Sequence, residues 1–222
     1  MIPSTTPMGT AHRRLRAQTM ADTQDLPAGR FASWLDQIGV DVPCGACTAC
    51  CTSSQFVHIG PDERDTLSRI PKALLFPAPG LPKGNVVMGY DERGHCPMLV
   101  DGACSIYDHR PRTCRSYDCR VFPAAGLEPD HEGRARIAEQ VRRWKFDFAQ
   151  PDDEILAAAV RAAAAYLRAN AHLLPGLVPS NSTQLAFLAV GIRAVFLERL
   201  ATGELRVVTP AIDAVRAALT PR

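Results

Sequence analysis

The sequence has no apolar run long enough to cross a bilayer and has little net charge. The longest uncharged apolar run near the C-terminus, residues 185–192, is far shorter than the ~20 residues of a membrane-spanning helix. Arg13, Arg14 and Arg16 are not followed by the apolar segment of a secretory signal. The formal net charge of +2 argues against gross electrostatic binding to nucleic acid or membrane. We therefore expect a cytoplasmic protein with no nucleic-acid partner and no membrane partner.

The sequence also lacks the fingerprints of common catalytic and cofactor sites. It contains no G-x-G-x-x-G or G-x-x-x-x-G-K-[ST], the glycine-rich loops that bind dinucleotides and nucleoside triphosphates. It contains no H-E-x-x-H and no G-x-S-x-G, the motifs of zinc proteases and serine hydrolases. The C-x3-C-x2-C spacing of radical-SAM enzymes and the zinc-finger spacing with paired histidines are absent as well. The chemistry of this chain must therefore be sought in its cysteines.

All eight cysteines lie within one segment of the chain, between residues 44 and 119. Four of them fall within eight residues, as C-x2-C-x2-C-C, and the others follow later in the segment. The full set is Cys44, Cys47, Cys50, Cys51, Cys96, Cys104, Cys114 and Cys119. Clustered thiols are either crosslinked or metal-bound, and in a reducing cytoplasm they indicate metal binding or catalysis. A disulfide framework stays the alternative, because adjacent cysteines also occur in secreted disulfide-rich folds.

The spacing of the first four cysteines favours a soft metal. A C-x2-C pair places two sulfurs on one tight turn, within reach of one metal ion at Zn–S distances of roughly 2.3 Å. A C-x2-C-x2-C run is also typical of iron–sulfur ligation. Cys50 and Cys51 are neighbours, so their side chains project in different directions. The pair therefore predicts two metal sites, one polynuclear cluster, or one thiol held free for chemistry.

The later cysteines also raise the question of whether the thiols serve one site or two. An ideal hairpin turning at residues 101–102 pairs Leu99 with Cys104 and places Cys96 on the opposite side from Cys104. The two thiols then serve different sites, unless the strand register is broken before Pro97. Eight thiolates fit two four-ligand sites, and one four-cysteine cluster with spare thiols is the rival arrangement.

Arginines surround the last two cysteines. Arg110, Arg112, Arg115 and Arg120 flank Cys114 and Cys119. A metal centre with four thiolates carries a formal charge of about −2, so arginine N–H groups could donate to its sulfurs. We predict that Arg110 and Arg115 contact the cofactor, with a solvated helix face as the alternative.

Three histidines, His58, His95 and His109, also lie among the cysteines. Histidine can replace cysteine at zinc. Because eight thiols are already available, we expect these histidines at the surface or beside the ligands.

The periodicity of the chain predicts a mainly α fold with short β-strands. Helices are expected at 31–38, 61–70, 137–148, 152–172, 181–200 and 209–219, strands at 56–59 and 86–90, a hairpin at 98–107, a loop at 71–84, and a helical turn from Pro111. The expected organisation is a disordered tail (1–26), an irregular metal-stapled cysteine module (27–125) and a helical C-terminal region (126–222).

The cysteine pattern resembles a known family. The run from Cys44 to Cys51, the later segment G-A-C-S-I-Y-D-H-R-P-R-T-C-R at 102–115, and Cys119 are similar to the CxxCxxCC cysteine-cluster family over residues 40–125. That family is described as zinc- or iron-chelating domains, and it includes relatives of flagellin lysine N-methylase. The resemblance implies that the eight cysteines bind a metal or an iron–sulfur cluster, and it leaves the helical region unexplained.

Three functions are open at this point. The first is a metal-binding protein that holds an iron–sulfur cluster, most simply [4Fe–4S], or zinc. The second is a redox or group-transfer enzyme, methylase-like, that depends on an iron–sulfur centre. The third is a structural zinc module that mediates protein interaction through the helices. We favour iron–sulfur over zinc, because adjacent cysteines suit a polynuclear site.

Overall fold

The computed structural model describes residues 25–40, 42, 44–130 and 134–220. Of these residues, 45% are helical and 15% are in strands, as the mainly α prediction requires. The predicted tail, 1–26, lies almost entirely outside the described residues. No helix in the described ranges is both long and apolar enough to cross a membrane.

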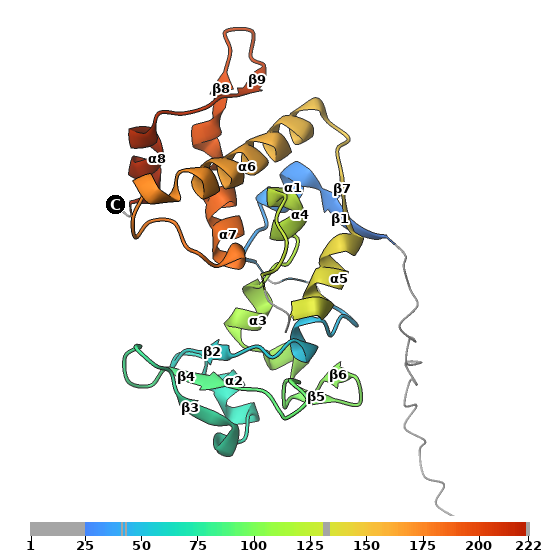
Figure 1. Ribbon diagram of the computed structural model, residues 1–222. Coiled ribbons are helices and arrows are strands. Elements are labelled where there is room, and N and C mark those ends of the chain that lie inside the picture. The colour runs from blue at the N-terminus through green and yellow to red at the C-terminus, as the bar shows by residue number, and fades with distance from the viewer. Residues whose placement is uncertain (1–24, 41, 43, 131–133, 221–222) are drawn as a thin grey trace, which may run out of the picture.

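The helices and strands follow one another in an irregular order (Figure 1). They are β1 (Leu26–Arg30), α1 (Phe31–Leu35), β2 (Val57–Ile59), α2 (Arg64–Arg69), β3 (Leu75–Pro77), β4 (Val86–Met88), β5 (Leu99–Val100), β6 (Ala103–Cys104), α3 (Arg112–Ser116), α4 (Val121–Ala125), α5 (Ala135–Arg143), β7 (Trp144–Asp147), α6 (Pro151–Ala169), α7 (Ser182–Ile192), β8 (Leu197–Arg199), β9 (Leu205–Val207) and α8 (Ile212–Leu219).

The described residues form two hydrophobic cores. The larger core is built from α1, α4, α5, α6, α7 and α8, and its largest fully buried side chains include Phe31, Phe122 and Phe196. We call this part the helical lobe. The smaller core consists of Val57, Ile59, Ile70, Met88 and Ile106. It lies under the antiparallel sheet β2–β4–β3, and we call this part, residues 57–109, the small lobe. In Figure 1 the small lobe lies below the helical lobe, with α3 between them.

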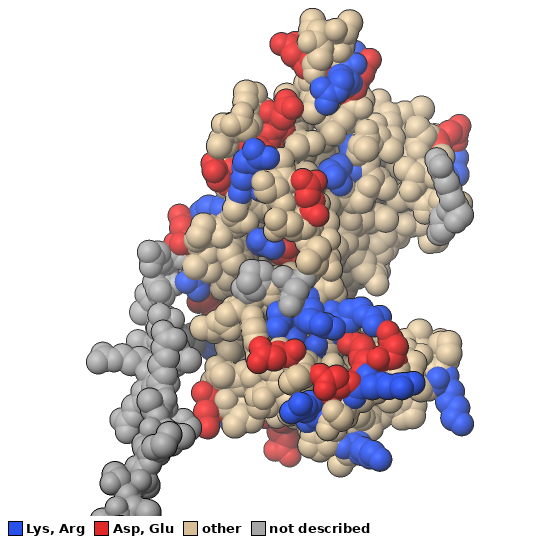
Figure 2. All heavy atoms as spheres, turned by 180° about the vertical axis from the view of Figure 1, so that it is seen from behind, with Lys and Arg blue, Asp and Glu red and all other residues tan. Residues whose placement is uncertain are grey.

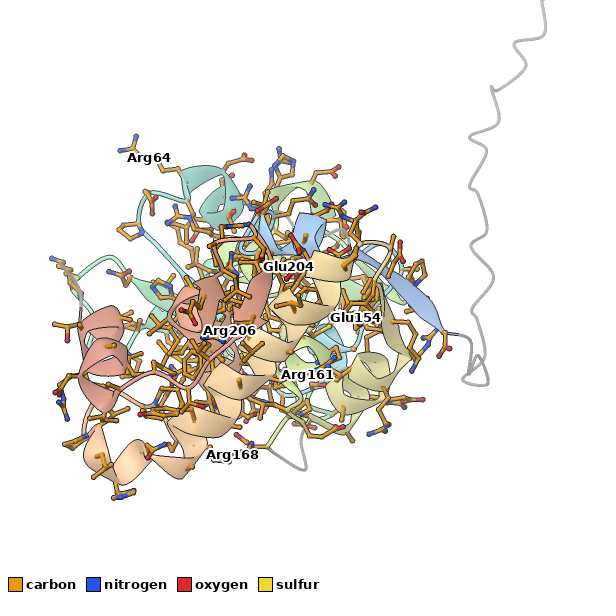
Figure 3. The ribbon with its side chains drawn as sticks, turned by 90° about the horizontal axis from the view of Figure 1, so that it is seen from above. Arg64, Glu154, Arg161, Arg168, Glu204 and Arg206 are labelled. Atoms are coloured by element: carbon orange, nitrogen blue, oxygen red, sulfur yellow. The ribbon has the colours of Figure 1, made fainter. Side chains whose placement is uncertain are left out.

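Helix α6 packs into the helical lobe because its apolar residues fall on one face. Pro151 opens the helix, and the Gln150 and Asp153 side chains complete a reciprocal capping box. The opposite face carries charge: Figure 3 shows Glu154, Arg161 and Arg168 following one another along the helix, and all three are exposed. The seven-residue spacing of these three side chains keeps them on one side of the helix.

The hairpin at 99–104 confirms the predicted register. Leu99 pairs with Cys104 across β5 and β6. The two turn residues, Asp101 and Gly102, have φ values of 50° and 77°. Such a turn needs two left-handed residues, which an Asp-Gly pair supplies. The helical turn expected after Pro111 is also present, as α3.

Two of the predicted helices are wrong in part. The expected helix 137–148 ends at Arg143, and Trp144 begins strand β7, which pairs in parallel with β1. The expected helix 181–200 starts at the Asn181 cap but ends at Ile192, and β8 and β9 form a hairpin after it. Gly203 lies in the connection of that hairpin, with φ +89°, and does not follow a helix end.

Three further predictions differ from the structure in smaller ways. The predicted loop 71–84 contains strand β3, which pairs with β4. The first predicted helix ends at Leu35 rather than 38. Helix α2 starts at Arg64 rather than 61, because the Glu63 side chain accepts the Gly60 N–H at 2.8 Å and holds this segment in a turn.

Charges of both signs are interleaved at the surface. Figure 2 shows acidic and basic side chains alternating over the lower part of the molecule, on the side of the small lobe. Within this region, residues of α2 line a polar surface pocket of about 240 Å³ together with His109, Arg112 and Arg115.

Candidate metal centre

The segment from Cys44 to Thr52 is a series of tight turns. The Cys44 N–H donates to the Val42 carbonyl at 2.8 Å, and the Cys47 N–H donates to the Cys44 carbonyl at 2.9 Å. Gly45 has φ +55°, and its N–H donates to the Tyr107 hydroxyl at 3.1 Å. A 3-10 turn then spans Cys50–Thr52. The turns keep the cysteines close together and tie them to the small lobe.

The second group of cysteines is brought to this segment by backbone hydrogen bonds. The Cys96 N–H donates to the Cys51 carbonyl at 2.7 Å, and the Ser54 N–H donates to the Gly94 carbonyl at 2.8 Å. Burial raises the pKa of Cys96, and the backbone N–H groups of Met98 and Leu99 partly offset this rise. N–H donors to sulfur favour the thiolate, the form that binds metal.

Cys50 and Cys51 face different neighbours. Burial raises the pKa of Cys50 well above its usual value, and the thiolate charges of Cys119, Cys47 and Cys44 raise it further, in that order. Burial likewise raises the pKa of Cys119 to about 12, with further contributions from Cys47 and Cys44. We call these four residues the Cys119 set.

The other four thiols act on one another. Burial raises the pKa of Cys51 to about 12, and the next contributions come from Cys96 and Cys104. Burial also raises the pKa of Cys114 to about 12, followed by Cys51, Cys96 and Cys104. We call Cys51, Cys96, Cys104 and Cys114 the Cys114 set. The sets are not fully separate: Cys44 raises the pKa of Cys51 and of Cys114 more weakly, Cys47 also raises that of Cys51, and Cys51 raises that of Cys50.

The hydrophobic packing divides the cysteines in the same way. Cys50 and Cys119 pack against the larger core. Cys96, Cys104 and Cys114 pack against the smaller core. These five cysteines are therefore divided between the two cores, and neither core includes Cys44, Cys47 or Cys51.

The donor chemistry of both sets fits a thiophilic metal. Each set supplies four soft thiols, which form no disulfide and are partly buried. The sulfurs do not form a ready-made coordination sphere: in the part of the chain that is described, no three Cys, His, Asp or Glu side chains are grouped so as to hold a metal ion. Rotation about χ1 moves a cysteine sulfur between staggered positions and leaves the backbone in place.

The two arginines predicted to contact the cofactor differ in their surroundings. Arg110 is 7% exposed, and it donates to the Val42 carbonyl at 3.0 Å and the Tyr107 carbonyl at 2.9 Å. Its guanidinium lies 4.0 Å from the centre of the Tyr107 ring. These contacts hold the backbone next to Cys44. Arg110 and Arg115 both line the surface pocket described above. Contact of either side chain with a cofactor stays a prediction.

Two of the histidines make defined side-chain contacts. His58 Nε2 lies 2.9 Å from Asn85 Oδ1. His109 Nδ1 pairs with Asp65 at the surface of α2. The His95 backbone N–H donates to Asp91 Oδ1 at 2.8 Å.

One residue at this site was not predicted from the sequence. Trp144 Nε1 donates a hydrogen bond to Cys119 Sγ at 3.2 Å. We had expected Trp144 within a helix, and no cysteine lies near it in the sequence. Its approach to Cys119 depends on the pairing of β1 with β7, which no local sequence pattern predicts.

The comparison with known families agrees with the cysteine pattern. Residues 43–133 match the family model "CxxCxxCC: Putative zinc- or iron-chelating domain". This segment contains all eight cysteines. Helices α5 to α8 follow the matched segment and are not part of it. No curated protein and no solved structure matches the chain.

Proposed function

We propose that this protein binds two metal centres, one at the Cys119 set and one at the Cys114 set. The surroundings of the adjacent thiols support the proposal: the largest thiolate effect on Cys50 comes from Cys119, and the largest on Cys51 come from Cys96 and Cys104. The match to a zinc- or iron-chelating family supports metal binding by the same segment. Four thiolates per centre are the ligands of structural zinc sites and of [4Fe–4S] clusters.

Of the two cofactors we favour iron–sulfur, with zinc as the alternative. Both sets offer only thiols, which is the usual donor set of a [4Fe–4S] cluster. A cluster would supply one-electron chemistry when bound, whereas zinc would supply a crosslink between the lobes. The protein's own residues would hold either group by presenting buried thiolates, with backbone N–H donors at Cys96 and the indole donor at Cys119. A cytoplasmic location would keep these thiols reduced.

The metal content of the purified protein tests the proposal. The protein should be expressed with iron and sulfide or with zinc, purified without oxygen, and analysed for metal per chain. We expect two equivalents of zinc, or about eight iron atoms with absorbance near ~400 nm if both centres are [4Fe–4S]. One centre per chain, or no metal, would overturn the proposal.

The identity of the metal also separates the alternative functions. An iron–sulfur centre is what a redox or group-transfer enzyme of the methylase type requires. A colourless protein that carries zinc would instead favour a structural module for protein interaction.

A further inference from the structure

Both tryptophans of the chain hydrogen-bond to one short segment. Trp34 Nε1 donates to Asp118 Oδ2 at 2.8 Å, and Trp144 Nε1 donates to Cys119 Sγ at 3.2 Å. Neither tryptophan belongs to the segment 43–133 that matches the cysteine family. Residues outside the matched segment therefore contact Asp118 and Cys119.

The Trp144 ring is held in place from two sides. Its backbone pairs with Leu26 at the start of the β1–β7 ladder. The Arg120 guanidinium lies 5.9 Å from the centre of the Trp144 ring, within the range of a cation–π contact. Arg120 is itself fixed by Asp118 at 2.7 Å and by the Ala28 carbonyl at 3.1 Å. The direction of the indole N–H is therefore set by the fold.

The chemistry of the indole fixes the role of the sulfur. An indole N–H can only donate, so Cys119 Sγ must accept. A charged sulfur accepts a stronger hydrogen bond than a neutral one. Donors to the ligand atoms of a metal site orient those ligands. The Trp144 contact therefore supplies the Cys119 sulfur with a hydrogen-bond donor that helps to fix its position.

We propose that Trp144 is a positioning residue for the metal centre of the Cys119 set, and that its indole emission responds to metal binding there. This inference rests on the proposed function. It assigns a role in the metal site to a residue beyond the cysteine domain. It also explains why β7 lies beside the site: the strand carries the donor that Cys119 needs.

The first test compares two substitutions, Trp144→Phe and Trp34→Phe. Each removes one indole N–H and keeps an aromatic ring, but only Trp144 donates to a cysteine. Zinc affinity would be measured by competition with a chromophoric chelator, after wild-type protein has been shown to bind two equivalents. Trp144→Phe should weaken one of the two equivalents by about 10- to 100-fold and leave the other unchanged. Equal zinc affinities in Trp144→Phe and wild type would overturn the inference.

The second test uses fluorescence and does not depend on the folding of Trp144→Phe. In Trp34→Phe protein, Trp144 is the sole tryptophan, so its emission should change when zinc is added. The additional substitution Cys119→Ala should abolish this change. The inference would be contradicted if the emission does not change when zinc is added, or if it still changes in the Cys119→Ala variant. A single zinc equivalent in the wild type would instead contradict the proposed function, and the fluorescence result would still decide the role of Trp144.

Discussion

The buried carboxylate next to Cys119 should be one of the most important polar groups of the fold. Asp118 is 0% exposed and accepts hydrogen bonds from four donor groups. The donors are the Trp34 indole at 2.8 Å, the Arg120 backbone N–H at 3.0 Å, and the Arg120 Nε and Nη2 atoms. The Arg120 side chain is 15% exposed, so the ion pair is screened little by water. Asp118→Ala would leave a buried guanidinium and a buried indole N–H without their acceptor. Breaking a buried pair in this way costs about 3–5 kcal/mol.

The assay is urea unfolding followed by far-ultraviolet circular dichroism, with reductant present and the metal concentration held constant. Glu198→Ala is the matched control, because Glu198 forms an ion pair with Arg206 in which the two side chains are 48% and 58% exposed. The control should change the free energy of unfolding by no more than about 1 kcal/mol. If Asp118→Ala is as mild as Glu198→Ala, the assignment of Asp118 as a buried anchor is wrong.

Two other predictions concern the metal directly. Burial raises the pKa values of Cys51, Cys114 and Cys119 to about 12, so these thiols are protonated at neutral pH in the metal-free protein. Metal must displace those protons, so zinc affinity should rise from about pH 6 to about pH 8, with proton release measurable by calorimetry in buffers of different ionisation enthalpy; an affinity independent of pH would contradict this. Removal of the metal by a chelator should expose residues 44–119 to amide hydrogen exchange and leave α6 and α7 protected, because the smaller core has only five buried residues. Loss of protection everywhere at once would show that the helical lobe also depends on the metal.

The features that the sequence predicted well are those with local causes. The Asp101-Gly102 turn sets the pairing of Leu99 with Cys104, because both turn residues must be left-handed. The Asn181 side chain accepts the Gln184 N–H at 3.2 Å, as its spacing predicted. Each of these signals lies within a few residues of the structure that it specifies.

The features that were missed depend on partners far away in the sequence. The apolar residues Ile137, Val141 and Trp144 fit one helix face, so the helix was extended through Trp144. Residues 144–147 in fact alternate between partly buried and exposed side chains, which is the period of a strand. That signal is only four residues long, and strand β7 forms because β1 offers it a parallel partner near the N-terminus.

The candidate site shows the same division. The adjacency of Cys50 and Cys51 was enough to predict that the two thiols point to different places. Which cysteines lie beside each of them could not be predicted from spacing, because Cys51 meets Cys96 through a backbone contact between distant segments. The position of Trp144 beside Cys119 follows from the β1–β7 pairing and has no counterpart in the cysteine motif.

The central claim, two separate four-thiolate centres, is tested most directly by metal analysis of two single substitutions. Cys119→Ala should lose the centre of the Cys119 set and keep the other, and Cys114→Ala should do the reverse, so each variant should retain half of the wild-type metal. Loss of all metal in both variants would contradict the account, because it would mean that the eight thiols hold one shared cluster.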